Sequence, residues 1–538
     1  MSAATLPGAF VSGLRNPILR GFNPDPSILR VGSDYYIATS TFEYHPAVRL
    51  HHSTDLAHWS TIGHALEDGF DLRGIPDSGG VWAPSLSYAD GLFWLAYSVV
   101  RTMDGDDKDI DNYLVTASSV TGPWSEPVHL GSRGFDFSFF HDPDGTHWIV
   151  GVQWDHRPEH PSFSGLVLEQ YLPDERRTAG ETAVLYREEG LVEGPNLYWI
   201  DGWYYLLIAA GGTGWNHGIT LARSRTLLGP YERDAREAVL TSRDAPGHPL
   251  QKAGHGELVQ TPAGDWLLVH LASRPTLHLG ERYSTLGRET CLQRVEFDDA
   301  GWLRLVGGGH HAQVAVGWEG AQAGSDSAPA PREWVDDFDG PVLDSVRWST
   351  LRAPLPPAVA DLSARPGWLA LRGGHSPGSV FDQSMILTRG EEHEAEMEVL
   401  IDADPRSPRE AAGVIAWYDR AGWIWLQITY DAENGRHLRV VQRNGVSTRS
   451  APTVVPDGPL RLRVALAGPR LTFAWAEQTG EWHEVPGVFP AWTLSDDHGP
   501  RLRFTGLFLG VRADDLDGRG WRADIGHARV RFVEPTHH

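Results

Sequence analysis

Aromatic and aliphatic residues alternate with polar ones in five short segments of the N-terminal part of the chain, each next to a turn that contains glycine. A period of two beside such a turn is typical of an antiparallel β-hairpin. A repeat of 54–62 residues is too long for a solenoid turn and fits one four-stranded blade of a β-propeller. The sequence therefore predicts a five-bladed propeller over residues 14–312. The repeated turn glycines are Gly32, Gly91, Gly145, Gly202 and Gly264.

A different pattern follows a stretch rich in Gly, Ala, Ser and Pro, residues 313–333, which is predicted to be a linker between domains. Beyond it, segments such as WIWLQITYD and LRLRVALAG alternate apolar and polar positions without the propeller repeat. Such alternation predicts an antiparallel β-sandwich over residues 334–538. The expected fold class is all-β, with a propeller followed by a sandwich.

Equivalent positions of the five repeats should lie at equivalent places around the propeller axis. Nine residues before the turn glycine stand Trp82, Asp136, Glu193 and His255, and in the first repeat an interval two residues shorter reaches Asp25. On the innermost strands these side chains would converge at one end of the channel. Carboxylates brought together shift one another's pKa values apart, which suits the acid and base of glycoside hydrolysis. The alternative is a structural role in turns at strand ends.

Composition narrows the function classes. With 70 acidic and 46 basic residues the net charge is −24, which disfavours nucleic acid and membranes as partners. A single cysteine, Cys291, leaves no intrachain disulfide or Cys-based zinc site. The N-terminal residues lack a signal-peptide pattern, so a cytoplasmic protein is expected. The 22 tryptophans supply flat rings that stack on sugars, although tryptophan also fills β cores.

Nine motifs along the chain resemble those of glycoside hydrolase family 43, and they are most similar to its two-domain β-xylosidases. They occur in the family's order and cover the whole predicted propeller. The resemblance implies an inverting hydrolase whose propeller carries a concanavalin-like sandwich. The motifs are NPDPS at Asn23, TFEYHPAV at Thr41, GGVWAPSLSY at Gly79, KDIDNYLVTA at Lys108, GFDFSFFHDPDG at Gly134, WDHR at Trp154, VEGPNLY at Val192, AGHGELV at Ala253 and LGRETCLQR at Leu286.

The resemblance implies the roles of the three acids. By motif match, Asp25 is the general base that activates water, and Glu193 is the general acid that protonates the glycosidic oxygen. Asp136 is the third carboxylate, which orients the acid and raises its pKa. No cofactor is required for this chemistry and no metal-binding residue is assigned. A calcium ion in the propeller channel stays open, because some relatives bind one near the central histidine.

The same resemblance implies the substrate-binding residues. Phe42 and Trp82 correspond to the apolar wall beside the non-reducing sugar, Arg288 to the arginine that holds sugar hydroxyls, and His255 to the histidine beneath the pocket. A sandwich loop with an FTGxFxG motif reaches the active-site mouth in the family, and here FTGLFLG makes Phe508 the corresponding residue. Ordinary packing in blades or in the sandwich core is the alternative for the aromatic residues.

The expected function is that of an exo-acting β-xylosidase that releases xylose from the non-reducing end of β-1,4-xylo-oligosaccharides. An α-L-arabinofuranosidase, or an enzyme with both activities, stays open, because Asn196 and Ala210 stand where related xylosidases commonly carry a histidine and an acidic residue. A non-catalytic sugar-binding propeller and a retaining fructan-type hydrolase are further alternatives. Retention requires carboxylates about 5–5.5 Å apart and inversion roughly 6.5–9.5 Å, and the longer separation is expected between Asp25 and Glu193.

Several other features receive no function on sequence grounds. GGTGWNHG at Gly211 lacks the spacing of a phosphate loop and is predicted to be an ordinary loop. DGDDKDIDN at Asp104 misses the EF-hand positions and is interpreted as a solvated acidic loop. The histidine pairs at 310–311 and 537–538 have no partners at zinc-site spacing. A homo-oligomer stays open, because relatives often form one.

Overall fold

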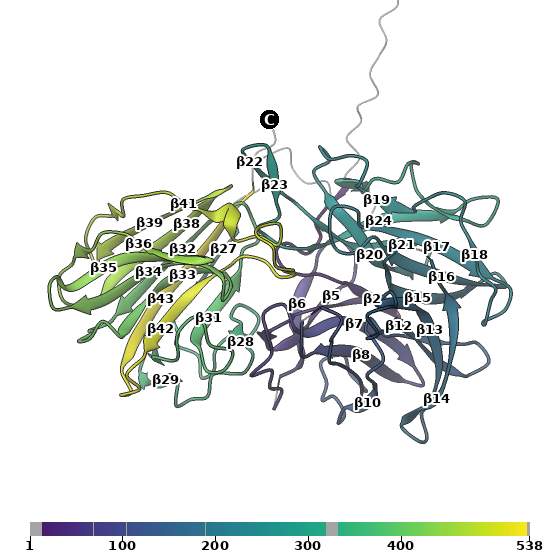
Figure 1. Cartoon of the computed structure of the whole chain (residues 1–538), viewed down its shortest axis with the longest axis horizontal. Coiled ribbons are helices and arrows are strands. Elements are labelled where there is room, and N and C mark those ends of the chain that lie inside the picture. The colour runs from purple at the N-terminus through teal and green to yellow at the C-terminus, as the bar shows by residue number, and fades with distance from the viewer. Residues whose placement is uncertain (1–12, 68, 104, 189, 319–331, 535–538) are drawn as a thin grey trace, which may run out of the picture.

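The computed structural model describes residues 13–67, 69–103, 105–188, 190–318 and 332–534. Figure 1 shows two β-rich domains side by side, a propeller in purple to teal and a sandwich in green to yellow. Over the described residues the one helical element is a 3-10 turn, η1 (Ala491–Thr493). None of these residues belongs to a helix long and apolar enough to cross a membrane. The predicted all-β fold class is confirmed.

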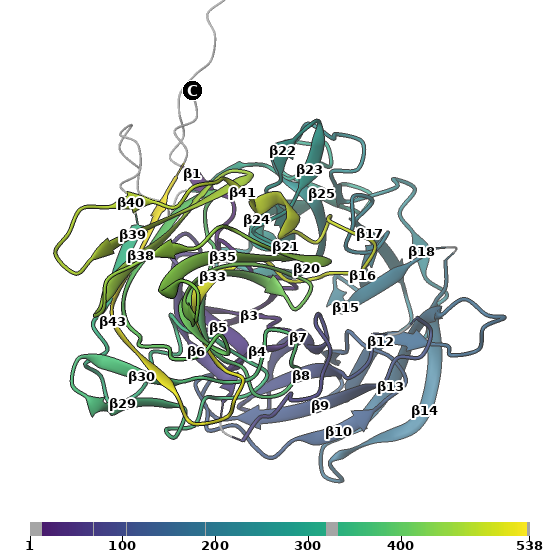
Figure 2. The ribbon, with the colours of Figure 1, turned by 60° about the vertical axis from the view of Figure 1, so that its left-hand side comes forward.

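Each propeller blade is one contiguous stretch of chain folded into an antiparallel sheet. The predicted turn joins the first two strands of every blade, and its glycine has a φ of 64–94° at all five positions. Other residues adopt this left-handed conformation only with strain, which explains the repeated glycine. The first strand of each blade lies innermost and contacts its counterparts in the neighbouring blades, so that the ring closes. Figure 2 shows the blades following one another around that ring.

The strands of the blades follow the order of the sequence. Blade 1 contains β2 (Ser27–Val31), β3 (Asp34–Thr39), β5 (Ala47–Ser53) and β6 (Ser60–Leu66). Blade 2 contains β7 (Gly80–Ala89), β8 (Leu92–Val100), β9 (Ile110–Ala117) and β10 (Val128–Gly131). Blade 3 contains β11 (Ser138–His141), β12 (His147–Trp154), β13 (Phe163–Leu172) and β14 (Arg177–Tyr186).

Blades 4 and 5 carry additional short strands. Blade 4 contains β15 (Val192–Ile200), β16 (Trp203–Ala210), β17 (Gly218–Ser224), β18 (Glu232–Arg233) and β19 (Leu240–Thr241). Blade 5 contains β20 (Gln251–Gln260), β21 (Trp266–Ser273), β24 (Glu289–Phe297) and β25 (Leu303–Leu305). Between β21 and β24 the chain forms a hairpin of β22 (Thr276–His278) and β23 (Glu281–Tyr283).

The two ends of the propeller meet in a separate two-stranded sheet, in which β1 (Gly13–Arg15) pairs with β26 (Ala315–Gly317). The range 313–333, predicted to be linker, therefore contains a strand, and its last two residues begin β27 (Arg332–Asp336) of the sandwich. The sequence pattern hides β26 because Val316 is its one buried residue.

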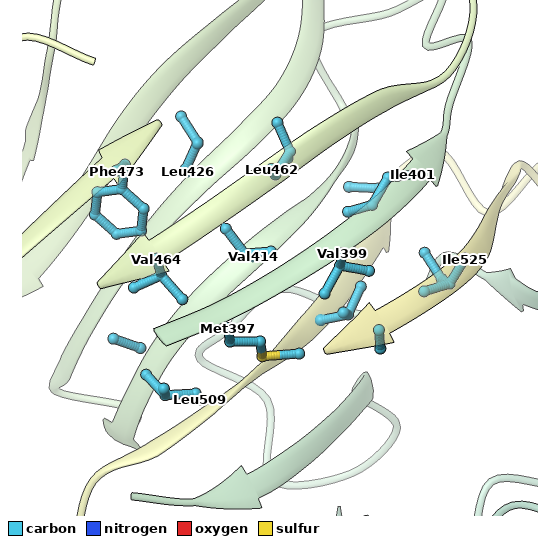
Figure 3. Close-up of a cluster of buried hydrophobic side chains, with 14 of the residues drawn as sticks. Met397, Val399, Ile401, Val414, Leu426, Leu462, Val464, Phe473, Leu509 and Ile525 are labelled. Atoms are coloured by element: carbon cyan, nitrogen blue, oxygen red, sulfur yellow. The ribbon is translucent and has the colours of Figure 1, made fainter. Parts of the chain in front are cut away.

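The second domain consists of two antiparallel sheets that enclose the core shown in Figure 3. Alternate residues of β32 (Glu394–Asp402), such as Met397, Val399 and Ile401, point between the sheets. One sheet runs in the order β29 (Ala360–Arg365), β30 (Trp368–Arg372), β43 (Arg522–Val533), β32 (Glu394–Asp402), β38 (Leu460–Ala467), β39 (Arg470–Glu477) and β40 (His483–Glu484), with β27 on β43 and β41 (Phe489–Pro490) on β39. The other runs in the order β31 (Ser384–Arg389), β42 (Phe508–Asp515), β33 (Glu410–Asp419), β34 (Gly422–Asp431), β35 (Gly435–Asn444) and β36 (Val446–Arg449), with β37 (Thr453–Val454) on β35.

The domains are joined by backbone pairing, stacked rings and partly buried ions. The strands β4 (Tyr44–His45) of the propeller and β28 (Thr350–Leu351) of the sandwich domain pair with each other. Tyr44 stacks on Phe508 with ring centroids 4.0 Å apart. Asp77 of the propeller accepts hydrogen bonds from Arg352 and Arg420 of the sandwich. Apolar contacts and partly buried charge pairs thus fix the sandwich beside one end of the propeller.

Candidate active site

The innermost strands are irregular at one level of the ring. The register shifts in β7 after Trp82, in β15 after Glu193, and twice in β20 between Gln251 and Gly256. Such bulges re-aim side chains and concentrate next to active sites. At this level each blade places one residue at positive φ: Asp25 (52°), Ala83 (35°), Asp136 (56°), Gly194 (51°) and His255 (35°).

All three candidate acids lie around one cavity. Asp25, Asp136 and Glu193 are each less than a tenth exposed and line the same space, together with His255 and Arg288. Asp136 accepts a hydrogen bond from the backbone N–H of Gly194, at 3.0 Å, and is thereby tied to the residue that follows Glu193. The propeller repeat thus brings together the residues that it placed in register.

The environment of Glu193 favours its protonated form. Burial, and then the nearby charge of Asp136, raise the pKa of Glu193 to about 8. One of its carboxyl oxygens, Oε1, is buried and has no hydrogen-bond partner among the described residues. Burial raises the pKa of Asp136 as well, to about 6, although the charge of His255 opposes this shift. A buried carboxyl that keeps its proton at neutral pH is suited to act as a general acid.

The environment of Asp25 favours its ionised form. Burial alone would raise the pKa of Asp25, but the charge of Arg288, with the His255 and Ser40 contacts, holds it well below its usual range. Arg288 donates from Nη1 to Asp25 Oδ1 at 2.7 Å, and the hydroxyl of Ser40 donates to Oδ2 at 2.7 Å. His255 Nδ1 lies 3.4 Å from Oδ1. Burial opposes protonation of His255, but the surrounding carboxylates raise its pKa to about 9.

The cavity has a volume of about 330 Å³ and a largely aromatic wall. The rings of Phe42, Trp82 and Phe504 lie in mutual contact, with centroids 5.5–6.1 Å apart. Phe42 belongs to blade 1, Trp82 to blade 2 and Phe504 to the sandwich, so that both domains form the wall. The guanidinium of Arg288 lies 5.3 Å from the Phe42 ring centroid.

The structure contradicts the assignment of Phe508 to the mouth of the site. Phe508 is 0% exposed, begins β42 and packs in the domain interface against Tyr44 and Phe22. Phe504, the first residue of the FTGLFLG motif, lines the cavity instead. The physical reason is that Phe508 is the first residue of β42, a strand buried along its whole length, whereas Phe504 precedes that strand in an irregular segment.

Sequence reasoning did not single out several residues of the wall. Lys108, Phe135 and Trp154 stand inside motifs quoted above, so motif membership was an available signal. The remaining residues come from loops and, for Phe163, from the first position of β13, and their proximity depends on the folded ring. These loops include the GGTGWNHG segment, a loop as predicted, whose Gly212, Thr213 and Gly214 border the cavity. The lining also contains Met103, Phe163, Leu191 and Leu502.

The two departures from related xylosidases lie below or outside the cavity. Asn196 borders a smaller space of about 20 Å³ in the channel, and its amide donates to the carbonyl of Gly256 at 3.3 Å. Ala210 lies on β16, where it pairs with Val192 and Gly218, and lines neither space.

The channel residues do not fit a calcium ion. Calcium takes six to eight oxygen ligands. The 20 Å³ space has room for about one water-sized body, so nearly all of these ligands would have to come from the protein. Glu257, a carboxylate of its lining, already accepts the Ile28 N–H at 2.7 Å, and burial raises the pKa of Glu257 to about 7. His255, with its pKa raised to about 9 despite burial, adds a positive charge. We therefore derive no step through a metal.

Comparisons with known proteins agree with the two-domain architecture. The model of the Glycosyl hydrolases family 43 matches residues 14–303, and that of the Beta xylosidase C-terminal Concanavalin A-like domain matches residues 335–531. This combination defines a class of propeller hydrolases with an added sandwich. The chain belongs to glycosyl hydrolase family 43.

Individual relatives extend over nearly the whole chain. A Xylosidase/arabinosidase 43B of Humicola insolens is 40% identical over 97% of this chain and 98% of its own length. A Beta-xylosidase of Bacillus subtilis is 38% identical over 96% of this chain and 99% of its own length. The crystal structure of xylan beta-1,4-xylosidase from Bacillus Halodurans C-125 is 41% identical, covers 96% of this chain and all of its own, and has a TM-score of 0.91.

Proposed function

We propose that this chain is an inverting exo-acting β-xylosidase that releases xylose from the non-reducing end of β-1,4-xylo-oligosaccharides. One observation carries the proposal. Two carboxyls of one cavity have pKa values shifted in opposite directions, with Glu193 raised to about 8, chiefly by burial, and Asp25 held low by Arg288 against the effect of burial. Paired shifts of this kind separate an acid from a base. The names of the full-length relatives support the substrate class.

The proposed reaction balances with one water per bond. Glu193 donates its proton to the glycosidic oxygen as the bond from the anomeric carbon to that oxygen breaks. Asp25 accepts a proton from water, whose oxygen attacks the anomeric carbon from the opposite face and inverts it. Asp25 then holds the proton, Glu193 is ionised, and exchange with solvent restores both groups. No cofactor enters this scheme.

The other polar residues modify the effect of burial on the two pKa values. Against the effect of burial, Arg288 and His255 keep Asp25 ionised by charge and hydrogen bonding. Asp136, held by the Gly194 N–H, adds negative charge beside Glu193 and so reinforces the effect of burial, which keeps Glu193 protonated. A separation of roughly 6.5–9.5 Å between the carboxyls of Asp25 and Glu193 is what the proposed inversion requires.

The walls of the cavity support exo action. Phe42, Trp82 and Phe504 offer ring faces that pack on the C–H groups of one sugar, and the 330 Å³ volume suits a terminal unit better than a long chain. The channel beneath the acids narrows to a 20 Å³ space, so the substrate enters from one side.

The deciding experiment follows the products of fresh xylobiose hydrolysis by NMR. A β-linked substrate should yield α-xylose first, and an initial β-anomer would overturn inversion. The absence of any hydrolysis would overturn the activity and leave a sugar-binding propeller.

A second candidate, an α-L-arabinofuranosidase or an enzyme with both activities, is favoured by two observations. Asn196 stands near the cavity floor in place of the histidine common in related xylosidases, and one full-length relative is named a xylosidase/arabinosidase. Rates on the paired nitrophenyl β-xyloside and α-L-arabinofuranoside decide between them. A higher kcat/KM on the arabinofuranoside would reverse the order of the two candidates.

A further inference from the structure

Ser78 occupies an unusual place between the two domains. It precedes β7, is 2% exposed and has a φ of 62°. Its N–H donates to Glu43 Oε2 at 3.1 Å, and its carbonyl accepts the indole N–H of Trp82 at 2.9 Å. Its hydroxyl oxygen accepts the backbone N–H of Phe504 at 3.1 Å. One buried serine thus contacts two residues of the aromatic wall, one in each domain.

We infer that Ser78 is a positioning residue that sets the aromatic wall of the sugar site by joining Trp82 of the propeller to Phe504 of the sandwich. This inference rests on the proposed function, because it concerns the same site. Ser78 does not line the cavity, so it acts through the two rings and not on the substrate.

The contacts of Phe504 show why this one hydroxyl matters. Phe504 lies in a segment without strand structure, so no sheet holds its backbone. Its N–H donates a hydrogen bond to the hydroxyl oxygen of Ser78, and its carbonyl accepts a hydrogen bond from Arg288 Nη2 at 3.1 Å. Both backbone groups of this sandwich residue are therefore bound by the propeller. Arg288 also donates to Asp25, so a shift of Phe504 reaches the candidate base as well as the wall.

Glu43, which accepts the Ser78 N–H, is also bound by the sandwich. Glu43 is buried, and burial together with the charge of Asp77 raises its pKa to about 8. The carbonyl of Glu43 accepts a hydrogen bond from the backbone N–H of Arg352 at 2.7 Å. The Asp77 carboxylate accepts hydrogen bonds from the guanidinium groups of Arg352 and Arg420. The residues that hold Ser78 are thus tied to the second domain too, and the docking of the domains determines where the wall stands.

The first test is Ser78→Ala, which removes the acceptor for the Phe504 N–H while leaving both rings in place. A buried N–H without a partner is costly, so the segment should move and KM for xylobiose should rise about tenfold. The ratio of kcat/KM for the nitrophenyl xyloside to that for the arabinofuranoside should change as well. Ser242→Ala is the matched control, because this serine is equally buried and donates to the Leu250 carbonyl at 2.7 Å outside the cavity.

Coupling separates positioning from a general loss of stability. Once Phe504→Ala has removed the ring, adding Ser78→Ala should raise KM no further, because the two residues act as a unit. Additive effects, or an unchanged KM and pentoside ratio in Ser78→Ala, would overturn the inference. If Ser78→Ala does not fold, Ser78→Cys keeps the bulk with a weaker acceptor and should give the same changes in smaller measure. Wild-type rates test the proposed function independently, since they do not involve Ser78.

An independent observation on the outside of blades 4 and 5 carries a second inference. Asp244 lies in the loop between β19 and β20, and His310 and His311 lie between β25 and β26. His310 Nε2 lies 2.9 Å from Asp244 Oδ2, and His311 Nε2 lies 2.9 Å from Oδ1. The Thr241 N–H donates to the His310 carbonyl at 2.8 Å and holds the two segments together. The histidine pair therefore has a partner that its sequence spacing could not reveal.

We propose that Asp244, His310 and His311 bind a divalent transition metal of the zinc class. The three side chains offer ligand atoms within 4.8 Å of one another, from two segments that the fold holds in place. Two imidazoles and a carboxylate, with a water in the fourth position, form a donor set that zinc accepts.

The test is calorimetric titration of the full chain with zinc chloride. The wild type should bind one equivalent that the double variant His310→Ala/His311→Ala loses, and His311→Ala alone should weaken binding by more than about tenfold. His58→Ala is the matched control, because His58 forms a similar exposed pair with Asp55, at 2.7 Å, without a second imidazole. Equal binding by the wild type and the double variant, or no binding by either, would leave an ordinary Asp–His ion pair and overturn the proposal.

Discussion

The innermost strands of the propeller and the neighbouring strands β32 and β38 of the sandwich use the same element differently. In the sandwich, β32 and β38 stay in register over every pair from Glu394–Ala467 to Ile401–Leu460, and their buried residues are apolar. In the propeller, β7, β15 and β20 shift register at the candidate site, and the buried residues there include carboxylates. The regular pairing of β32 with β38 stabilises a core, whereas the register shifts at the candidate site aim side chains at a common point. A shift can also lie within a core, as between Val399 and Ile401 of β32 where it pairs with β43.

The sandwich follows the same rule where it enters the site. Among the described residues, Leu502 and Phe504 are those of the sandwich that line the cavity, and both lie outside strands. Four residues after Phe504, Phe508 lies inside a strand and is core. A strand that packs regularly thus serves stability, and the segment before it serves the site.

Glu193→Ala should have the largest effect on catalysis, because it removes the proposed general acid. Glu193 lies where the pairing of β15 with β16 shifts register. Without a general acid, kcat on xylobiose should fall by about 10²–10⁴-fold. Nitrophenyl xyloside should lose less, because its leaving group needs no proton. Steady-state rates on the two substrates check this. Glu237→Ala, a variant of an exposed acid remote from the cavity, serves as control. Unchanged rates on xylobiose would remove Glu193 from the acid role.

Asp136→Asn should alter the pH profile. Activity requires protonated Glu193, so kcat/KM should decline as pH rises through about 8, where burial and Asp136 place the pKa of Glu193. Removing the charge of Asp136 lowers that pKa, so the alkaline limb should move down by about one pH unit. The measurement is kcat/KM against pH for both proteins. An alkaline limb that stays in place or moves to higher pH in Asp136→Asn would show that the charge of Asp136 does not raise the pKa of Glu193.

Phe504→Ala and Phe508→Ala should separate site from core within one motif. Loss of the Phe504 ring should raise KM about tenfold with little change in Tm. Loss of the fully buried Phe508 should lower stability by about 3–5 kcal/mol through the cavity it leaves. Thermal unfolding and KM measured on both variants check the contrast. The reverse assignment of effects would restore Phe508 to the mouth of the site.

Leu462→Ala, in the core shown in Figure 3, should have the smallest effect on catalysis. The substitution should lower the free energy of unfolding by about 2–5 kcal/mol. Well below the unfolding temperature, kcat/KM should match that of the wild type, because β38, the strand that contains Leu462, contributes no residue to the cavity lining. Denaturant unfolding and rates at low temperature check this. A large loss of kcat/KM in the folded variant would show that sheet packing reaches the site.

Much of the fold follows from the sequence, because the repeated glycine and the alternation after it are local signals. The same repeat singles out Asp25, Asp136, Glu193 and His255, since equivalent positions share one level of the ring. Phe504 was missed although its signal was present: Phe508 belongs to the continuous apolar run LFLGV, and Phe504 stands before that run.

Other parts of the site depend on proximity that no local pattern carries. Met103 and Leu502 reach the cavity only because loops of blade 2 and the sandwich meet in the folded chain. His310 and Asp244 are 66 residues apart in sequence and come together through the packing of blades 4 and 5. Motif spacing describes neither kind of contact.

The pairing of β1 with β26 places Gly13 opposite Gly317, so the propeller begins and ends at one point. Every blade is also contiguous in the chain. The ring could therefore be opened between two other blades and its original ends fused, with each sheet preserved. A circularly permuted gene would encode the same ring, and an appended domain could precede or follow it. The closure of the ring thus does not dictate the order of the two domains in the chain, whereas the docking of the sandwich depends on the particular residues of the interface.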